Sequence, residues 1–121
     1  MKLKESGEMY LETIYMLNKE LGQVRSIDVC ERMGYSKPSI SRAMTLLRQG
    51  GYVEMDKHGF LTLTELGLDV AKSMAERHAI LSDFLIHLGV SEETALDDAC
   101  KIEHVISEEA FAAIKNAMNK E

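Results

Sequence analysis

The sequence predicts a mainly α-helical protein in two parts, three helices with a β-hairpin followed by a helical C-terminal half. Apolar residues recur with a helical period along most of the 121-residue chain, and only one proline interrupts it. Two short alternating runs, "YVEM" and "FLTLT", flank the turn "DKHG" near the middle of the chain, which is the pattern of a hairpin. Apolar residues make up 45% of the chain and charged residues 28%, as in ordinary globular proteins.

Three helices are predicted before the hairpin. "EMYLETIYMLNKEL", residues 8–21, has a broad apolar face, and "GQVR" interrupts the helix. "SIDVCERMG" predicts a short second helix with Ser26 as its N-cap and Gly34 as its C-terminal stop. In "YSKPSISRAMTLLRQGG", Ser36 can cap a third helix and Pro38 suits the first turn. The two glycines at the end of this stretch terminate the third helix.

Helix, short helix, helix and hairpin is the order of a winged helix-turn-helix, in which the third helix reads DNA. The apolar stripe of the third helix would pack on the first two helices. Its other face carries hydroxyls and cations suited to phosphates and base edges, namely Ser36, Lys37, Ser39, Arg42 and Thr45. A helical domain without a role in DNA binding is the alternative, and the position of the hairpin favours the winged helix-turn-helix.

The charge distribution is compatible with DNA contact through one end of the protein. The net charge is −6, but residues 1–64 hold nine basic and eight acidic residues, whereas residues 65–121 hold five and twelve. Within residues 32–57 the balance is five basic to two acidic. A local basic surface beside an acidic body can still bind DNA. The alternative interpretation is scattered, solvated surface charge.

The second half predicts further helices. "TELGLDVAKSMAERHAILSDFLIHLG" opens with Thr64 as a cap and forms one long helix, or two joined near His78. "SEET" and "SEEA" predict N-caps at Ser91 and Ser107 for two more helices. In a DNA-binding protein such a helical, acidic half usually forms a dimer. We therefore expect a DNA-binding domain at 1–64 and a helical dimerisation domain at 65–121.

The stretch "CKIEHVIS" brings three potential metal ligands together. On a helix, Cys100, Glu103 and His104 would project from one face, so that a thiolate, a carboxylate and an imidazole point at a common spot. The alternative is a chance coincidence of a buried cysteine, an exposed glutamate and a capping histidine.

Three residues elsewhere in the chain strengthen the metal hypothesis. Met9 and Glu12 share one face of the first helix, and His78 lies in the middle of the fourth helical segment. If these segments meet the "CKIEHVIS" helix, the result is a mixed sulfur, nitrogen and oxygen site. Such a site suits Fe, Zn, Ni or Co, with Mn also accommodated by carboxylate, and is a poor site for Mg or Ca.

The segments "EMYLETIYML", "SKPSISRAMTLL" and "ACKIEHVIS" resemble the diphtheria toxin repressor family of metal-dependent repressors, which includes the manganese transport regulators. The resemblance runs over nearly the whole chain, and the C-x-x-E-H pattern is its most specific part. It implies an N-terminal winged helix-turn-helix followed by a helical dimerisation domain. It also implies a divalent metal as corepressor and a dimer that binds palindromic operators near metal-uptake genes.

The resemblance also implies a ligand set. The Met, Cys, Glu and His of iron-type members match Met9, Cys100, Glu103 and His104. Glu12 matches a metal-binding glutamate of the manganese type, and His78 matches a second-site ligand of both branches. Two other second-site positions of the iron type are occupied here by Ser82 and Leu96. A manganese-type pairing of Glu12, His78 and Glu103 is therefore the expected second site.

The same comparison, together with the helix pattern, implies a DNA-contact surface. We expect it to contain Arg25, Ser36, Lys37, Pro38, Ser39, Ser41 and Arg42. Arg42 stands where iron-type members often have glutamine. Since arginine prefers guanine and glutamine prefers adenine, the operator should differ accordingly.

These observations predict a homodimeric, metal-activated transcriptional repressor, with Fe(II) the favoured metal and Mn(II) second. Two cysteines and the lack of an apolar leader predict a cytoplasmic protein. The sequence contains no run of eighteen apolar residues, so we expect no membrane span. One alternative is a winged-helix regulator that senses a small organic ligand or the redox state through Cys100. The other is a small metalloenzyme, for which no substrate pocket can be inferred from the sequence.

Overall fold

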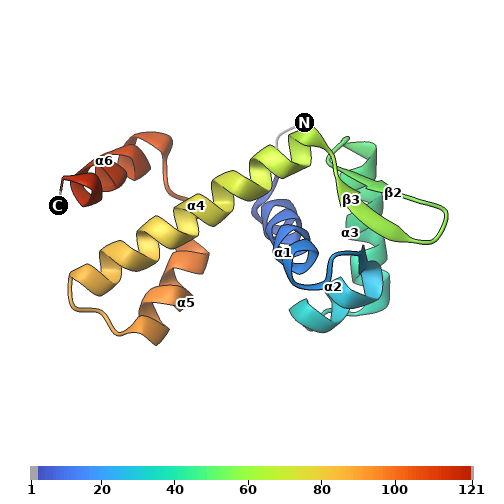
Figure 1. Ribbon diagram of the computed structural model, residues 1–121, viewed down its shortest axis with the longest axis horizontal. Coiled ribbons are helices and arrows are strands. Elements are labelled where there is room, and N and C mark those ends of the chain that lie inside the picture. Colours follow the sequence, from blue (N-terminus) through green and yellow to red (C-terminus); the bar gives the residue numbers. More distant parts are fainter. Residues whose placement is uncertain (1–2, 121) are drawn as a thin grey trace. The chain divides into compact units, whose positions relative to one another are not determined.

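The computed structural model describes residues 3–120. Its elements in chain order are α1 Glu5–Leu21, β1 Val24–Arg25, α2 Ser26–Met33, α3 Lys37–Gln49, β2 Val53–Met55, β3 Phe60–Leu63, α4 Glu65–His87, α5 Glu92–Ile102 and α6 Glu108–Asn119 (Figure 1). The chain forms two compact units, one up to Lys72 and the other from Ser73. The change from one unit to the other falls within α4.

The first unit is a winged helix-turn-helix, as the sequence predicts. It consists of helices α1, α2 and α3 and a three-stranded antiparallel sheet of order β1-β3-β2. In this sheet Val24 pairs with Leu61 and Val53 pairs with Leu63. The sequence analysis missed β1 and treated its residues only as a break after α1. A two-residue strand has no alternation to detect, and its identity depends on pairing with β3.

The helix caps agree with the sequence except at α2. The Ser36 side chain accepts the Ser39 N–H at 3.3 Å, and Gly34 ends α2 with a left-handed φ of 72°. Ser26 is not the cap of α2, because it is already the first helical residue. The backbone N–H of Arg25 donates instead to the Asp28 carboxylate at 2.8 Å. An acid three residues after the cap therefore closes this helix end.

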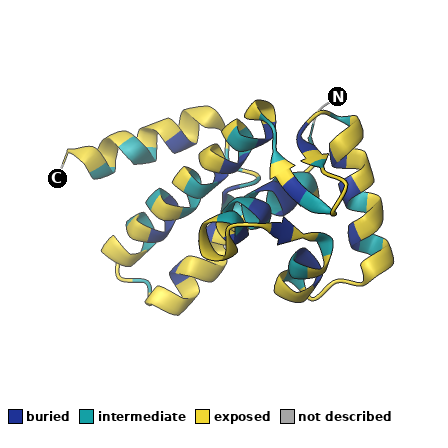
Figure 2. Ribbon diagram, turned by 45° about the vertical axis from the view of Figure 1, so that its right-hand side comes forward, coloured by how far each residue is buried: buried dark blue, intermediate teal, exposed yellow. Residues whose placement is uncertain are grey.

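The core of the first unit lies between the three helices and the sheet. The stripe predicted on α3 is buried at Ile40, Met44 and Leu47. Burial alternates with exposure along the same helices (Figure 2). The fully buried residues that pack with α3 in this core are Leu11, Ile14, Val24, Val29 and Ala71.

In the second half, α4 is one continuous helix, so the alternative of two joined helices is excluded. The predicted caps of the later helices form: Ser91 accepts the Thr94 N–H at 3.4 Å, and Ser107 accepts the Ala110 N–H at 3.0 Å. The small core of the second unit consists of Leu81, Ala99 and Phe111, with Ile80, Ile102, Ile106 and Ile114 packed against it. Within residues 3–120, no helix has the length and apolar character needed to cross a membrane.

Candidate metal centre and nucleic-acid interface

The turn that follows α5 carries the most ligand-rich segment of the chain. Helix α5 ends at Ile102, so Glu103 is its C-cap and His104 lies in the turn beyond it, while Cys100 stays in the last helical turn. The expectation that Cys100, Glu103 and His104 all lie within one helix is therefore wrong. The Glu103 N–H still donates to the Ala99 carbonyl at 3.0 Å, whereas the N–H groups of Val105 and Ile106 both donate to the Ile102 carbonyl at 3.0 Å.

The burial of the side chains in this segment is the opposite of what a chance coincidence of ligands predicts. That interpretation needed a buried cysteine and an exposed glutamate, whereas Glu103 is fully buried and Cys100 is exposed. The His104 side chain is also almost fully buried, at 3% exposure. A buried carboxylate loses its hydration, which costs several kcal/mol unless partners replace the water. The Glu103 carboxylate therefore needs partners inside the protein.

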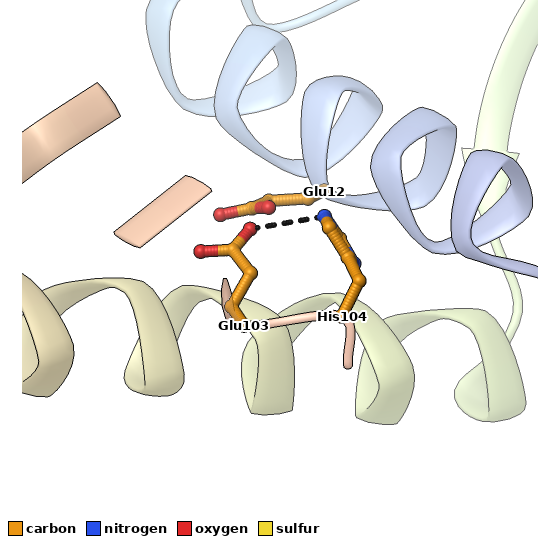
Figure 3. A group of neighbouring side chains, drawn as sticks. All are labelled: Glu12, Glu103 and His104. Atoms are coloured by element: carbon orange, nitrogen blue, oxygen red, sulfur yellow. Dashed lines mark ion pairs between the residues drawn. The ribbon is translucent and has the colours of Figure 1, made fainter. Parts of the chain in front are cut away.

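Two imidazoles provide such partners for Glu103. His78 on α4 places Nδ1 at 2.9 Å from Glu103 Oε2. His104 places Nε2 at 3.3 Å from Glu103 Oε1, and Figure 3 marks this second contact. Each carboxylate oxygen thus faces one imidazole nitrogen. We call His78, Glu103 and His104 the carboxylate–imidazole cluster.

A divalent transition metal fits the donor atoms of this cluster. Imidazole nitrogen suits Fe, Zn, Ni and Co, and carboxylate oxygen also suits Mn. When bound, such a metal would supply the positive charge that balances the buried carboxylate of Glu103. Within the second unit, one carboxylate and two imidazoles of the kinds that bind such metals therefore lie together.

The remaining predicted ligands and second-site positions belong to α1, α4 and α5. Met9 and Glu12 are half-buried residues of α1 in the first unit. Ser82, at a second-site position of the iron type, is buried and its hydroxyl donates to the His78 carbonyl at 2.7 Å. Leu96, at the other such position, is 42% exposed. The Ser82 hydroxyl is thus hydrogen-bonded within α4 and is not a ligand of the kind that the iron type has at this position.

Arg77, the neighbour of His78 on α4, was also missed by the sequence analysis. Its Nη1 donates to the carbonyl of Glu103 at 3.1 Å and to the carbonyl of Ile106 at 3.0 Å. Nothing in the sequence distinguishes this arginine from a solvated one. Its partners are backbone carbonyls, which carry no residue pattern.

Most side chains predicted to contact DNA are accessible in the first unit. Lys37, Pro38, Ser41 and Arg42 are exposed in the first half of α3. Ser39 is half-buried, and its hydroxyl accepts a hydrogen bond from the Ser36 hydroxyl at 2.9 Å. The N-terminus of α3 thus presents two cations and a set of hydroxyls to solvent, which suits phosphate contact.

The seventh residue of this predicted surface, Arg25, lies beside the hairpin. Its guanidinium is 4.3 Å from the centre of the Phe60 ring. The hairpin turn is closed by Asp56, whose Oδ1 accepts the N–H of His58 at 2.8 Å and that of Phe60 at 2.9 Å. These bonds favour the charged carboxylate, so the pKa of Asp56 lies below its usual value, with the Phe60 N–H the largest cause. The predicted hairpin is therefore the wing beside α3.

The fold and the cluster together define a class of protein, namely a winged-helix DNA-binding regulator whose C-terminal unit carries a cluster of metal-binding side-chain types. Comparison with known families specifies the class further. Residues 2–61 match the N-terminal DNA binding domain of iron dependent repressors, and residues 64–120 match their metal binding and dimerisation domain. The chain belongs to the iron-dependent repressor family. It is a metal-dependent transcriptional repressor of this family, as the resemblance implied.

Curated relatives cover nearly the whole chain. The transcriptional regulator MntR of Escherichia coli O6:H1 is 38% identical over 112 residues, which is 93% of this chain and 72% of the relative. An uncharacterised HTH-type transcriptional regulator of Methanocaldococcus jannaschii is 32% identical over 120 residues, or 98% of this chain and 96% of the relative. These relatives are regulators rather than enzymes, so the metalloenzyme alternative is set aside.

Solved structures show the same fold. A manganese-dependent transcriptional repressor in complex with manganese aligns with a TM-score of 0.85 at 30% identity, covering 93% of this chain and 52% of that one. The manganese regulator SloR aligns with a TM-score of 0.82 at 26% identity, covering 98% and 55%. The chain thus spans about half the length of these two structures.

Proposed function

We propose that the protein is a homodimeric, cytoplasmic repressor that binds a palindromic operator near metal-uptake genes when a divalent metal is bound. The observation that carries this proposal is the buried Glu103 carboxylate between two imidazoles, in a chain that also has an exposed recognition helix. DNA contact is assigned to residues 1–64, and metal binding with dimerisation is assigned to residues 65–121.

The proposed ligands extend beyond the carboxylate–imidazole cluster. Met9 and Glu12 of α1 join it, together with Cys100, as the family resemblance implies. Because these ligands come from both units, a bound metal would favour one arrangement of the two units by its greater affinity for that arrangement. This preference is how metal would control operator binding.

Fe(II) is the proposed physiological metal, with Mn(II) second. The thioether of Met9 and the thiolate of Cys100 provide soft donors, from which Fe(II) gains more than the harder Mn(II). The glutamate at position 12 and the similarity to two solved structures titled as manganese regulators support Mn(II) as the second choice.

Dimer formation is supported by apolar side chains that the small second core leaves in solvent. Leu88 is 63% exposed and Val105 is 66% exposed, and Ile86 and Leu96 are 42% exposed. Burying such surface would contribute roughly 25 cal/mol per Å² removed from water. A second copy of the chain is the proposed partner of this surface.

The DNA surface is proposed to divide by task. Lys37 and the hydroxyls at the start of α3 would contact phosphates, which orient the helix, and Arg42 would contact a base edge. Arg25 would add a cation beside the wing. The proposed DNA contacts are Arg25, Ser36, Lys37, Pro38, Ser39, Ser41 and Arg42.

The test is operator binding as a function of metal. The full chain, stripped of metal, is titrated with Fe(II), Mn(II), Zn(II) or Co(II) under anaerobic conditions, and operator affinity is measured by fluorescence anisotropy. Metal should tighten specific binding at least about tenfold, which corresponds to about 1.4 kcal/mol of coupling. Equal affinity with metal and with a chelator would contradict the proposal. Metal-independent binding that responds to thiol oxidation would support the Cys100 alternative.

A further inference from the structure

Arg77 holds the turn between α5 and α6 at two points. Its Nη1 donates to the Glu103 carbonyl at 3.1 Å and to the Ile106 carbonyl at 3.0 Å. Its guanidinium also lies over the Phe111 ring of α6, 5.4 Å from the ring centre. One half-buried cation therefore connects α4, the turn and α6.

Through these contacts Arg77 touches the backbone of a residue of the carboxylate–imidazole cluster. Glu103 is held from α4 twice, by His78 at its carboxylate and by Arg77 at its carbonyl. Carbonyls at the end of a helix lack intrahelical partners, so a donor from another helix can fix them. Arginine suits this task because its planar guanidinium presents several N–H donors in a fixed geometry.

We propose that Arg77 is a positioning residue for metal binding. By fixing the turn at Glu103 and Ile106, it keeps the Glu103 carboxylate and the His104 imidazole in place before a metal arrives. This inference rests on the proposed function, because it assigns a partner to the proposed site. Groups that orient metal ligands from behind typically contribute about 10–100-fold to metal affinity.

The charge of Arg77 and its hydrogen bonds should affect metal affinity in opposite directions. A guanidinium beside a metal site repels the cation, so loss of its charge alone would tighten metal binding. Loss of the two carbonyl contacts would release the turn and weaken metal binding. The direction of the change therefore separates positioning from simple charge.

The experiment uses the full chain without metal, under anaerobic conditions, with Co(II) as the probe. Co(II) affinity is measured by absorption spectroscopy and by competition with a chelator. Arg77→Met keeps the length of the side chain but removes the donors, and Arg77→Lys keeps a cationic donor. Lys115→Met is the matched control, because Lys115 pairs with Glu76 at 3.1 Å on the surface of the same unit.

The expected result is a loss of at least about tenfold in Co(II) affinity for Arg77→Met. Arg77→Lys should recover part of the loss, and Lys115→Met should bind Co(II) as the parent does. Circular dichroism and chemical denaturation of the metal-free proteins show whether each variant is folded. A folded Arg77→Met that binds Co(II) as tightly as the parent, or more tightly, overturns the proposal.

Two further outcomes are informative. If Arg77→Met does not fold, Arg77→Lys decides: weaker binding with a changed Co(II) spectrum supports positioning, and parental affinity refutes it. If the parent itself binds no Co(II), the proposed function fails together with this inference. If the parent binds Co(II) and the Arg77 variants bind it with the same affinity, only the positioning role of Arg77 is refuted and the proposed function stands.

Discussion

Glu103 is a buried charged residue that the stability of the fold does not require. Its carboxylate is fully buried and lies within 2.9 Å of His78 and 3.3 Å of His104. Removing one partner of a buried charge leaves the other uncompensated, which typically costs about 3–5 kcal/mol. An apolar side chain of similar size would avoid this cost, so the conformational stability of the second unit does not require a carboxylate at this position.

Arg42 is the residue for which the sequence makes the sharpest statement about DNA. If its guanidinium binds the O6 and N7 atoms of a guanine, Arg42→Ala should cost roughly 1–3 kcal/mol and relax preference at one operator position. Binding measured across a set of operator variants tests this. Lys37→Ala is the control, because loss of a phosphate contact should weaken all sequences alike and lower the salt dependence. An Arg42→Ala variant with the sequence preference of the parent would contradict the assignment of α3.

Metal choice is tested by exchanging the two sulfur ligands. Met9→Asp combined with Cys100→Glu replaces both sulfur donors with carboxylates, so the bias toward softer metals should disappear. We expect the ratio of the Fe(II) and Mn(II) activation midpoints to shift toward Mn(II) by about tenfold, or about 1.4 kcal/mol. Anaerobic activation curves for operator binding provide the measurement. A parent that already prefers Mn(II), or an unmoved ratio, contradicts the role of sulfur.

At the scale of elements, the beginning of α4 packs against the end of the turn after α3. Gly67 is buried there, and a Cβ atom at this position would lie 2.0 Å from the Tyr52 carbonyl oxygen. The Tyr52 carbonyl also accepts the Thr64 N–H at 3.1 Å, so it cannot move without losing that bond. The absence of a side chain at position 67 therefore allows α4 to begin against the wing.

Gly67→Ala should destabilise the protein, although alanine favours helices by about 1 kcal/mol over glycine. The clash involves backbone rather than a flexible side chain, and overpacking typically costs about 1–3 kcal/mol. Urea denaturation should show a lower free energy of unfolding. Gly7→Ala in α1 is the matched control, because its Cβ would clash with the movable Leu3 side chain rather than with backbone, and would meet Leu47 at an ordinary contact distance. Gly7→Ala should be neutral or stabilising, and equal behaviour of both variants would contradict the packing argument.

At the scale of the whole molecule, metal and DNA are proposed to act on one equilibrium. Thermodynamic linkage requires the coupling to be reciprocal, so operator DNA must tighten metal binding by the factor by which metal tightens operator binding. Co(II) affinity measured with and without operator should therefore change by the same factor, about tenfold or more. A mismatch between the two factors would show that a further equilibrium, such as dimer formation, contributes to the coupling.

The sequence by itself determined the order of the helices, most of their caps and the wing. These features depend on local patterns: apolar periodicity, Ser36 and Ser107 as caps, and the alternating runs on each side of "DKHG". The family could also be inferred, because its most specific pattern lies within nine consecutive residues. The candidate ligands were named for the same reason, since Cys100, Glu103 and His104 are near neighbours in the chain.

Only the tertiary structure decided the features that depend on partners distant in sequence. Strand β1 exists because it pairs with β3. The structure also decided between one helix and two near His78, because α4 continues through that residue. The burial of Glu103 between His78 and His104 follows from packing, whereas sequence spacing alone allowed an exposed glutamate. The contacts of Arg77 with two backbone carbonyls were equally invisible, because a carbonyl is the same at every residue. Local periodicity thus specifies elements, and only packing brings side chains far apart in the sequence into one site.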